Sequence, residues 1–282
     1  KMTAPDGKQR ETDAFSTTDL LRVIQSIPSP KAEPFKLWLA RVGYERIEET
    51  ENPEDEEEKI REHLKDAEVL AGINRSSAEW VKEAANVKWI HAFSAGVDKI
   101  LIPEVVNSDI VVSNSSGIHA TPIAEHVLAF LLIFARQFHI TIRNQEKKLW
   151  EKQGAMTELL DKTVLVVGMG NIGKEIGRLA NAIGAKVRAI DVNTKEKPEW
   201  VEEVKTPDYI AEELANADFV VSALPLTSKT EHYFAKELFS QMKSSAVFIN
   251  IGRGKVVNEK ELIEALQKGT IAGAALDVME EE

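Results

Sequence analysis

The sequence predicts an α/β protein with two domains, each built on a parallel sheet that carries helices on its faces. Its length is the first reason, because 282 residues exceed what one core of common size holds. The second reason is the alternation of short apolar runs with helical patterns, which is typical of parallel sheets. The third is a glycine-rich turn between an apolar run and a helical pattern in the second half, which indicates a doubly wound sheet.

The composition fits a globular chain and excludes several classes of function. A net charge of -11 argues against a nucleic-acid binder, which would need a basic surface. The chain has no cysteine, which excludes disulfides, thiol catalysis and thiolate metal ligands, and we expect no metal. The longest apolar run, "HVLAFLLIFARQFHI", contains Arg136 and is too short to cross a membrane. Since the first residues also lack an apolar signal core, we expect a cytoplasmic protein that contacts no membrane.

The first predicted domain covers residues 20–118 and follows a polar, patternless extension over 1–19. Its helices are expected over 29–43, over the acidic segment 52–67 and in "SAEWVKEAANV". The acidic helix is interpreted as a solvated face, because its carboxylates favour the positive end of a helix. Strands are expected at Leu21–Ile27, 44–49, 68–73, Lys88–Ala92 and in "DIVVSNSSG".

The second predicted domain covers residues 119–282 and begins with a long helix over 121–147. Pro122 lies in the first turn of this helix, where a missing amide does no harm. We expect the helix to bridge the domains or to form a subunit interface. Strand, turn, helix and strand follow over 162–191, and a later helix is expected between Asn258 as its cap and Gly269 as its stop. Three more apolar strands are expected in "DFVVSALPLT", "AVFINIGRG" and "AGAALDV".

The segment "GMGNIG" indicates a dinucleotide site. Gly168 permits a tight turn, Gly170 lets the backbone approach a pyrophosphate, and Gly173 allows close packing of helix on strand. Asp191 ends the next strand, 18 residues after Gly173 (191 minus 173), where an acid accepts the ribose hydroxyls of NAD. It would repel the 2′-phosphate of NADP, although the neighbouring Lys195 keeps NADP open. The alternative is a packing turn that binds no nucleotide.

Two further loops follow strands of the same domain, and ligands of open α/β sheets lie beyond the carboxyl ends of strands. The loop with Pro225 is expected to contact the adenosine or the nicotinamide ribose, the alternative being a plain turn. Arg253 stands between two glycines, and its planar fork suits the carboxylate and carbonyl oxygens of a 2-oxo acid. The alternative is an isolated surface arginine. Further candidates for contact with the cofactor are Leu224, Thr230, Ile251 and Gly252.

Small and acidic residues complete the set of candidates. In "FSAGVD", the amides of Ala95 and Gly96 could form a nest for a carboxylate, although a turn without a ligand explains the segment equally well. Asp277 ends the last strand, where a carboxylate could accept a hydrogen bond from the nicotinamide carboxamide. Glu282 follows five residues later (282 minus 277), and an acid so placed commonly orients and charges a histidine.

These motifs, in this order, resemble the D-isomer-specific 2-hydroxyacid dehydrogenases from about Leu20 to Glu282. The segments concerned are "SAGVD", "SSGIHATPIAEHVL", "VVGMGNIG" with Asp191, "NIGRGKVVN" and "AALDVMEEE". The resemblance implies two Rossmann-like domains, of which an NAD-binding doubly wound sheet is inserted into a flavodoxin-like substrate domain. It also implies a homodimer formed through the region of the 121–147 helix. The implied reaction is the reversible reduction of a 2-oxo acid to a D-2-hydroxy acid with NADH.

The resemblance also assigns roles to individual residues. Arg253 corresponds to the arginine that binds the substrate and polarises its carbonyl group, and Glu282 corresponds to the catalytic glutamate. Ala95 and Gly96 would offer amides to the substrate carboxylate. The pyrophosphate would contact Asn171 and Ile172, and the nicotinamide would contact Asp277.

One departure from the family pattern concerns the proton donor. The family's general acid is a histidine beyond the catalytic glutamate, whereas no histidine follows Arg253 in this sequence. His119 is the nearest rival, for which a hinge role or a contact at the cofactor edge is the alternative. We therefore expect the natural protein to continue past Glu282. A different function on the same fold also stays open, namely a non-catalytic NAD-binding redox sensor or corepressor.

Overall fold

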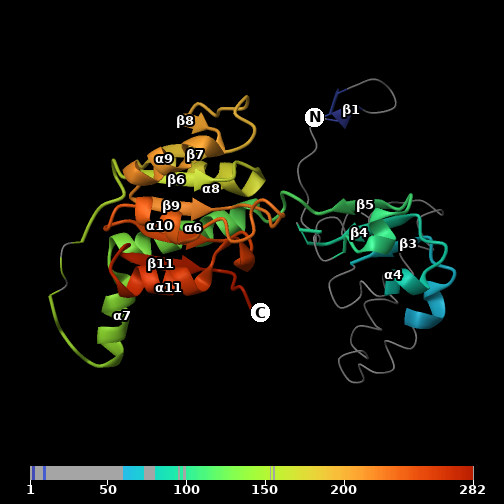
Figure 1. The fold of residues 1–282 in the computed structure, drawn as a ribbon, viewed down its shortest axis with the longest axis horizontal. Helices are drawn as coiled ribbons and strands as arrows, with labels where there is room; N and C mark the ends of the chain where they lie inside the picture. The colour runs from blue at the N-terminus through green and yellow to red at the C-terminus, as the bar shows by residue number, and fades with distance from the viewer. Residues whose placement is uncertain are drawn as a thin grey trace. The chain divides into compact units, whose positions relative to one another are not determined.

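The computed structural model describes residues 60–72, 80–94, 96–97, 100–152, 154 and 156–281, and the backbone of 2–3 and 9–10. The chain divides into two compact units, residues 1–118 and 119–282 (Figure 1). The elements predicted before residue 50 lie outside the described residues, and so do Ala95 and Glu282.

Unit 1 contains a small parallel sheet with the order β3-β4-β5. Its strands are β3 (Val69–Ala71), β4 (Trp89–Ala92) and β5 (Val111–Asn114), at the places where the sequence predicts strands. Ile90 and Leu70 point into a core that is shared with α4 (Trp80–Glu83) and α5 (Pro103–Val106). The sequence does not predict α5, because four residues are too few to show a helical period. Within the expected extension, β1 (Met2–Thr3) pairs with β2 (Gln9–Arg10) in an antiparallel manner.

Unit 2 is built on a six-stranded parallel sheet with the order β11-β10-β9-β6-β7-β8. The chain starts in the middle of this sheet, builds outward to β8, returns beside β6 and then builds to the other edge. This is the doubly wound arrangement that the sequence predicts, with its switch point between β6 and β9. The strands are β6 (Thr163–Val167), β7 (Lys186–Ile190), β8 (Val201–Lys205), β9 (Phe219–Ser222), β10 (Val247–Asn250) and β11 (Gly273–Leu276).

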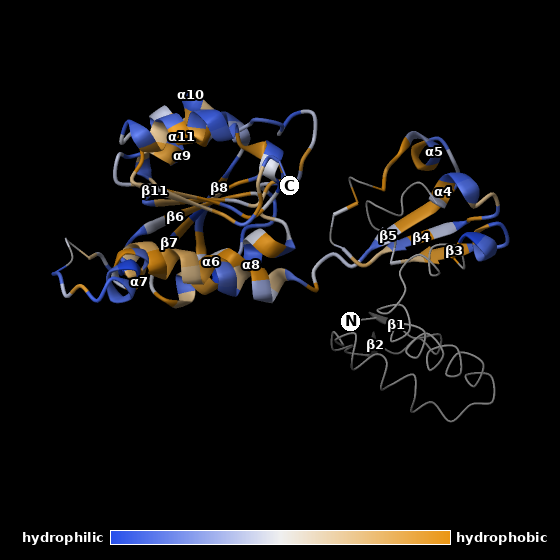
Figure 2. Ribbon diagram, turned by 90° about the horizontal axis from the view of Figure 1, so that it is seen from below, coloured by the Kyte–Doolittle hydropathy of each residue, from blue (hydrophilic) through white to orange (hydrophobic). Residues whose placement is uncertain are grey.

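Helices cover both faces of the unit 2 sheet (Figure 2). One face carries α6 (Ala120–Ala135) and α8 (Asn171–Ala182), and the other carries α9 (Ile210–Asn216), α10 (Lys236–Gln241) and α11 (Glu259–Gln267). Val164 and Val166 point into the first core, whereas Leu165 and Val167 point into the second. Burial on both faces explains why these strands are continuous apolar runs. Asn258 caps α11 as predicted, since its side chain accepts from the Glu261 amide.

The single helix predicted over 121–147 is wrong, because the chain forms two helices. Gln137 adopts a left-handed conformation (φ 54°), which stops α6 and turns α7 (Phe138–Glu146) by 74°. A stripe of four residues on α6 is buried in the core, whereas α7 buries none. No single helix in the described ranges is long and apolar enough to span a membrane. The bent pair of α6 and α7 passes the same test of length and composition.

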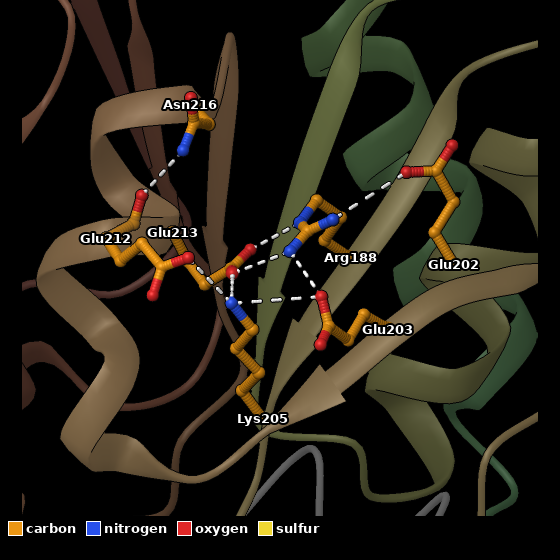
Figure 3. Close-up of polar contacts among 7 residues, drawn as sticks. All are labelled: Arg188, Glu202, Glu203, Lys205, Glu212, Glu213 and Asn216. Atoms are coloured by element: carbon orange, nitrogen blue, oxygen red, sulfur yellow. Dashed lines mark hydrogen bonds and ion pairs between the residues drawn. The ribbon is translucent and has the colours of Figure 1, made fainter.

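A network of charges links β7, β8 and α9 (Figure 3). Glu213 is only 2% exposed, and its carboxylate accepts from the guanidinium of Arg188 and pairs with Lys205 Nζ at 2.8 Å. The hydrogen bond from Arg188 lowers the pKa of Glu213 against the opposing effect of burial. Glu203 joins both cations from the solvent side. The network therefore ties the edge strand β8 to β7, and Asp191 of the candidate site directly follows β7.

Candidate dinucleotide and substrate site

Two glycines of "GMGNIG" are required by the packing of the turn after β6. Gly168 has a φ of 101°, and a Cβ there would lie 2.9 Å from the carbonyl oxygen of Ala223. A Cβ on Gly173 would overlap the carbonyl oxygen of Gly168. By contrast, nothing lies within 4 Å of the Cβ position at Gly170. The turn therefore leaves open space at its middle glycine, as a site that receives a phosphate group requires.

The first turn of α8 borders this open space. Gly170 is the N-cap residue, and the helix begins at Asn171 and continues through Ile172 and Gly173. A helix of 12 residues directs the N–H groups of its first turn and the positive end of its dipole outward at this point. These residues fit a pyrophosphate. The predicted contacts of Asn171 and Ile172 remain predictions.

Asp191 ties the glycine turn to the loop after β7. Its Oδ2 accepts from the Met169 amide at 2.6 Å, and its Oδ1 accepts from the Asn193 amide at 2.7 Å. A carboxylate has about four acceptor positions, so Asp191 can also accept from ribose hydroxyls. Lys195 lies exposed in the same loop, with its amide bonded to Asn193 Oδ1 at 3.2 Å. The structure thus joins Asp191 to the glycine turn, and its contact with the ribose stays a prediction.

The loop after β9 adjoins the loop after β10. A Cβ on Gly252 would overlap the carbonyl oxygen of Leu224, so the two loops are in backbone contact. Thr230 closes the first loop, because its hydroxyl donates to the Pro225 carbonyl at 2.6 Å and accepts from the Thr227 amide at 2.8 Å. Pro225 is exposed in the loop after β9, whereas Ile251 is buried. Of these candidates, Thr230 therefore shapes the loop.

The backbone at Arg253 is held by Asn250, a polar residue that is fully buried. The Asn250 side chain donates to the carbonyl of Arg253 at 3.0 Å and accepts from the Gly252 amide at 3.2 Å. The guanidinium of Arg253 bonds back to the Gly252 carbonyl at 2.9 Å. On the far side, Gly254 lies so close to the Met279 carbonyl that a Cβ would overlap it. The Arg253 turn is therefore fixed from both sides.

Residues 277–280 pack against this turn after β11 ends. The Asp277 amide donates to the Asn250 carbonyl at 3.0 Å, and its Oδ1 lies 3.3 Å from His126 Nε2 on α6. Glu280 pairs with His232 at 2.8 Å, and the resulting hydrogen bond lowers the pKa of that carboxyl group. The Glu280 amide also donates to Glu259 at 2.6 Å. The segment that leads to Glu282 is thus anchored beside Arg253.

Sequence reasoning missed three residues that the structure brings to this edge of the sheet. Asn250 gave a usable signal, because it is a polar residue inside an otherwise apolar strand. His126 and His232 gave none, since each meets its carboxylate partner from a distant part of the chain.

The remaining candidates lie in the loop after β4 of unit 1 and at the start of unit 2. Ser94 Oγ donates to the Gly96 carbonyl at 2.7 Å, which closes the predicted turn. His119 is the N-cap residue of α6 and is exposed, and its side chain makes no capping bond. Across the described ranges, no three His, Asp or Glu side chains are grouped as a metal site would require.

A family model described as the D-isomer specific 2-hydroxyacid dehydrogenase, NAD binding domain, matches residues 128–282. The chain belongs to this family. A glyoxylate reductase of Pyrococcus furiosus is 34% identical over 241 residues, which cover 80% of this chain and 70% of that protein. A D-3-phosphoglycerate dehydrogenase of Methanocaldococcus jannaschii is 32% identical over 228 residues. That match covers 80% of this chain, but the chain spans only 44% of that relative.

Solved structures agree with the family assignment. The crystal structure of a D-isomer specific 2-hydroxyacid dehydrogenase family protein from Aeromonas salmonicida superposes with a TM-score of 0.73 at 29% identity. The match covers 80% of this chain and 72% of that one. The predicted family and its NAD-binding domain are therefore confirmed.

Proposed function

We propose that this protein is an NAD-dependent dehydrogenase that reversibly reduces a 2-oxo acid to the D-2-hydroxy acid. One observation carries the proposal. The glycine turn with Asp191 lies on one side of the switch point, and the rigid turn that presents Arg253 lies two strands away on the other. A dinucleotide that lies across the carboxyl ends of the strands would thus place its reactive end beside an arginine.

Some residues of unit 2 bind the cofactor, and others bind the substrate. Asp191 accepts from the adenosine ribose, and the open turn at Gly170 with the start of α8 receives the pyrophosphate. Bound NADH supplies the hydride. Arg253 binds the substrate carboxylate and carbonyl oxygen through its planar fork and stabilises the negative charge that develops on that oxygen. Asn250 keeps the arginine in place, so that little reorganisation is needed during the reaction.

Residues of unit 1 and the last residue of the sequence complete the proposal, for substrate binding and for proton transfer. The turn at Ala95 and Gly96 would bind the substrate carboxylate through backbone amides. Glu282 would orient and charge a histidine that gives the carbonyl oxygen its proton. The names of the relatives include glyoxylate and phosphoglycerate, and every 2-oxo acid offers the same carboxylate and carbonyl pair to Arg253. We propose this class of substrate and NAD over NADP, since Asp191 would repel a 2′-phosphate.

We also propose a homodimer, in which α7 contributes more of the interface than α6. Apolar side chains are exposed on α7 and just after it, whereas the apolar stripe of α6 is already buried in its own core. An apolar surface of this kind commonly marks an interface. The residues are Phe138, Ile140, Ile142, Leu149 and Trp150. Sedimentation of the protein should show a dimer, and Ile142→Lys with Trp150→Lys should yield monomers.

The reaction is tested with the full-length protein, NADH and a panel of 2-oxo acids that includes glyoxylate. We expect the absorbance of NADH to fall, and we expect Arg253→Ala to abolish turnover while NADH affinity stays within about twofold. If Arg253→Ala abolished NADH binding instead, the role given to this residue would be wrong. Tight NADH binding with no oxidation by any acid would refute the enzyme and support the non-catalytic sensor.

A further inference from the structure

A histidine and an aspartate of unit 2 meet at the edge of the sheet where the nicotinamide is expected. His126 Nε2 lies 3.3 Å from Asp277 Oδ1, although 151 positions separate the two residues (277 minus 126). His126 comes from the second turn of α6, and Asp277 directly follows β11. Within the part of the chain that the structure describes, His126 is the one basic side chain that pairs with this carboxylate.

The position of His126 is fixed by a row of rings on α6. His126 contacts Phe130 edge to face, with ring centroids 4.4 Å apart and planes at 71°. Phe134, the next member of this four-residue spacing, lies against Gly273, where a Cβ would come within 2.6 Å of its ring. The row therefore runs antiparallel to β11. His126 lies at the carboxyl end of the strand, beside Asp277, and Phe134 lies at its first residue, Gly273. The absent side chain at Gly273 lets α6 approach that closely.

The pair is poorly placed to serve stability. Its side chains are 48% and 42% exposed, and an exposed ion pair commonly contributes under about 1 kcal/mol. A role toward a ligand explains its place better. Asp191 and the glycine turn hold the adenosine half of a dinucleotide over β7 and β6, so the nicotinamide half extends over β9, β10 and β11. Arg253 and Asp277 stand beyond the ends of the last two of these strands.

We propose that His126 is a positioning residue for the nicotinamide, and this proposal rests on the function proposed above. Its Nε2 lies 3.3 Å from one oxygen of Asp277, where an N–H group fixes the rotation of the carboxylate. The carboxylate retains acceptor positions on its other oxygen, which accepts an N–H of the nicotinamide carboxamide. Because the carboxamide turns with the ring, the pair selects which face of the nicotinamide is presented beside Arg253.

Two substitutions separate the polar contact with Asp277 from the packing of the ring. His126→Phe keeps an aromatic ring against Phe130 but has no donor for Asp277. His126→Gln loses the ring but keeps an N–H donor. His139→Phe is the matched control. His139, on α7, also contacts a ring of the row, namely Phe134, with ring centroids 5.0 Å apart. Phe134 lies near the last residue of α6, far along the helix from His126.

The test measures the binding of NADH and of ADP-ribose to each variant by calorimetry. ADP-ribose contains every part of the cofactor except the nicotinamide, so the ratio of the two affinities isolates the proposed contact. We expect His126→Phe to weaken NADH about tenfold, the effect of one hydrogen bond to a charged group, and ADP-ribose less than about twofold. His126→Gln and His139→Phe should resemble the unaltered protein, and melting temperatures should change little.

Three results bear against these ideas, and they can be told apart. An equal loss of both ligands in His126→Phe would show that the histidine only supports the fold. Unchanged NADH binding in that variant would show that Asp277 does not need it. If the unaltered protein bound neither ligand, the proposed function itself would be wrong, and the inference would fall with it.

Discussion

Glu213→Gln should destabilise unit 2 by about 3 kcal/mol. The change keeps the size of the side chain but removes the charge that Arg188 and Lys205 share, and these cations are only 23% and 15% exposed. Breaking a buried ion pair costs about 3 to 5 kcal/mol because the partner charges stay buried. We expect the lower end, since Glu203 remains bonded to Arg188 at 2.6 Å. For a unit of this size, the loss corresponds to a melting temperature lower by about 6 to 12 °C.

The measurement is hydrogen exchange of peptides from β9 and β10, whose strands are buried throughout and report the unfolding of unit 2. Glu203→Gln is the control, because Glu203 contacts the same two cations from a position that is 48% exposed, and its loss should cost under about 1 kcal/mol. The pKa of Glu213 is lowered in the folded state, so its contribution is complete above the ordinary value of 4.5 and disappears as the pH falls through the folded pKa. Equal costs for the two variants at pH 7 would refute the reasoning.

Three further predictions concern the site. Gly170→Ala should weaken NADH binding at least tenfold without loss of stability, because its methyl group enters the open space meant for the phosphate. Gly173→Ala should also lower the free energy of unfolding by about 1 to 3 kcal/mol, because its methyl group overlaps the backbone. Calorimetry measures NADH binding and urea unfolding measures the stability of both variants. Asp191→Ser should raise the affinity for NADPH relative to NADH at least tenfold, and an unchanged ratio would show that this carboxylate does not select the cofactor. Asn250→Ala should cost about 1 to 3 kcal/mol and lower kcat while the Kd of NADH stays constant, and loss of NADH binding would contradict the role given to it.

Much of unit 2 was predictable because its sheet is buried on both faces. A strand such as β6 or β10 is then a continuous apolar run, and the carboxyl ends of such strands locate the loops with Gly168 and Arg253. β8 was not predicted, because only two of its five residues are apolar and it lies at the edge of the sheet. The break at Gln137 was also missed, because a left-handed glutamine leaves no trace in the hydrophobic pattern.

The parts of the site that could not be predicted depend on contacts between distant segments. The sequence shows that Arg253 lies between glycines, but it does not show that the backbone of Leu224 and Met279 occupies the space beside them. It likewise gives no reason to join His126 to Asp277, since that pairing follows from the direction in which α6 crosses the sheet. Residue types at strand ends were therefore readable from the sequence, whereas their partners required the structure.

The crowding around Arg253 also limits how this enzyme can be altered. Because Gly252 and Gly254 each face a backbone carbonyl with no room for even a methyl group, random replacement of these neighbours would produce damaged turns and few new specificities. The Arg253 turn is therefore held in one backbone arrangement. A library aimed at a different substrate should therefore leave 250–254 untouched and vary residues outside this turn.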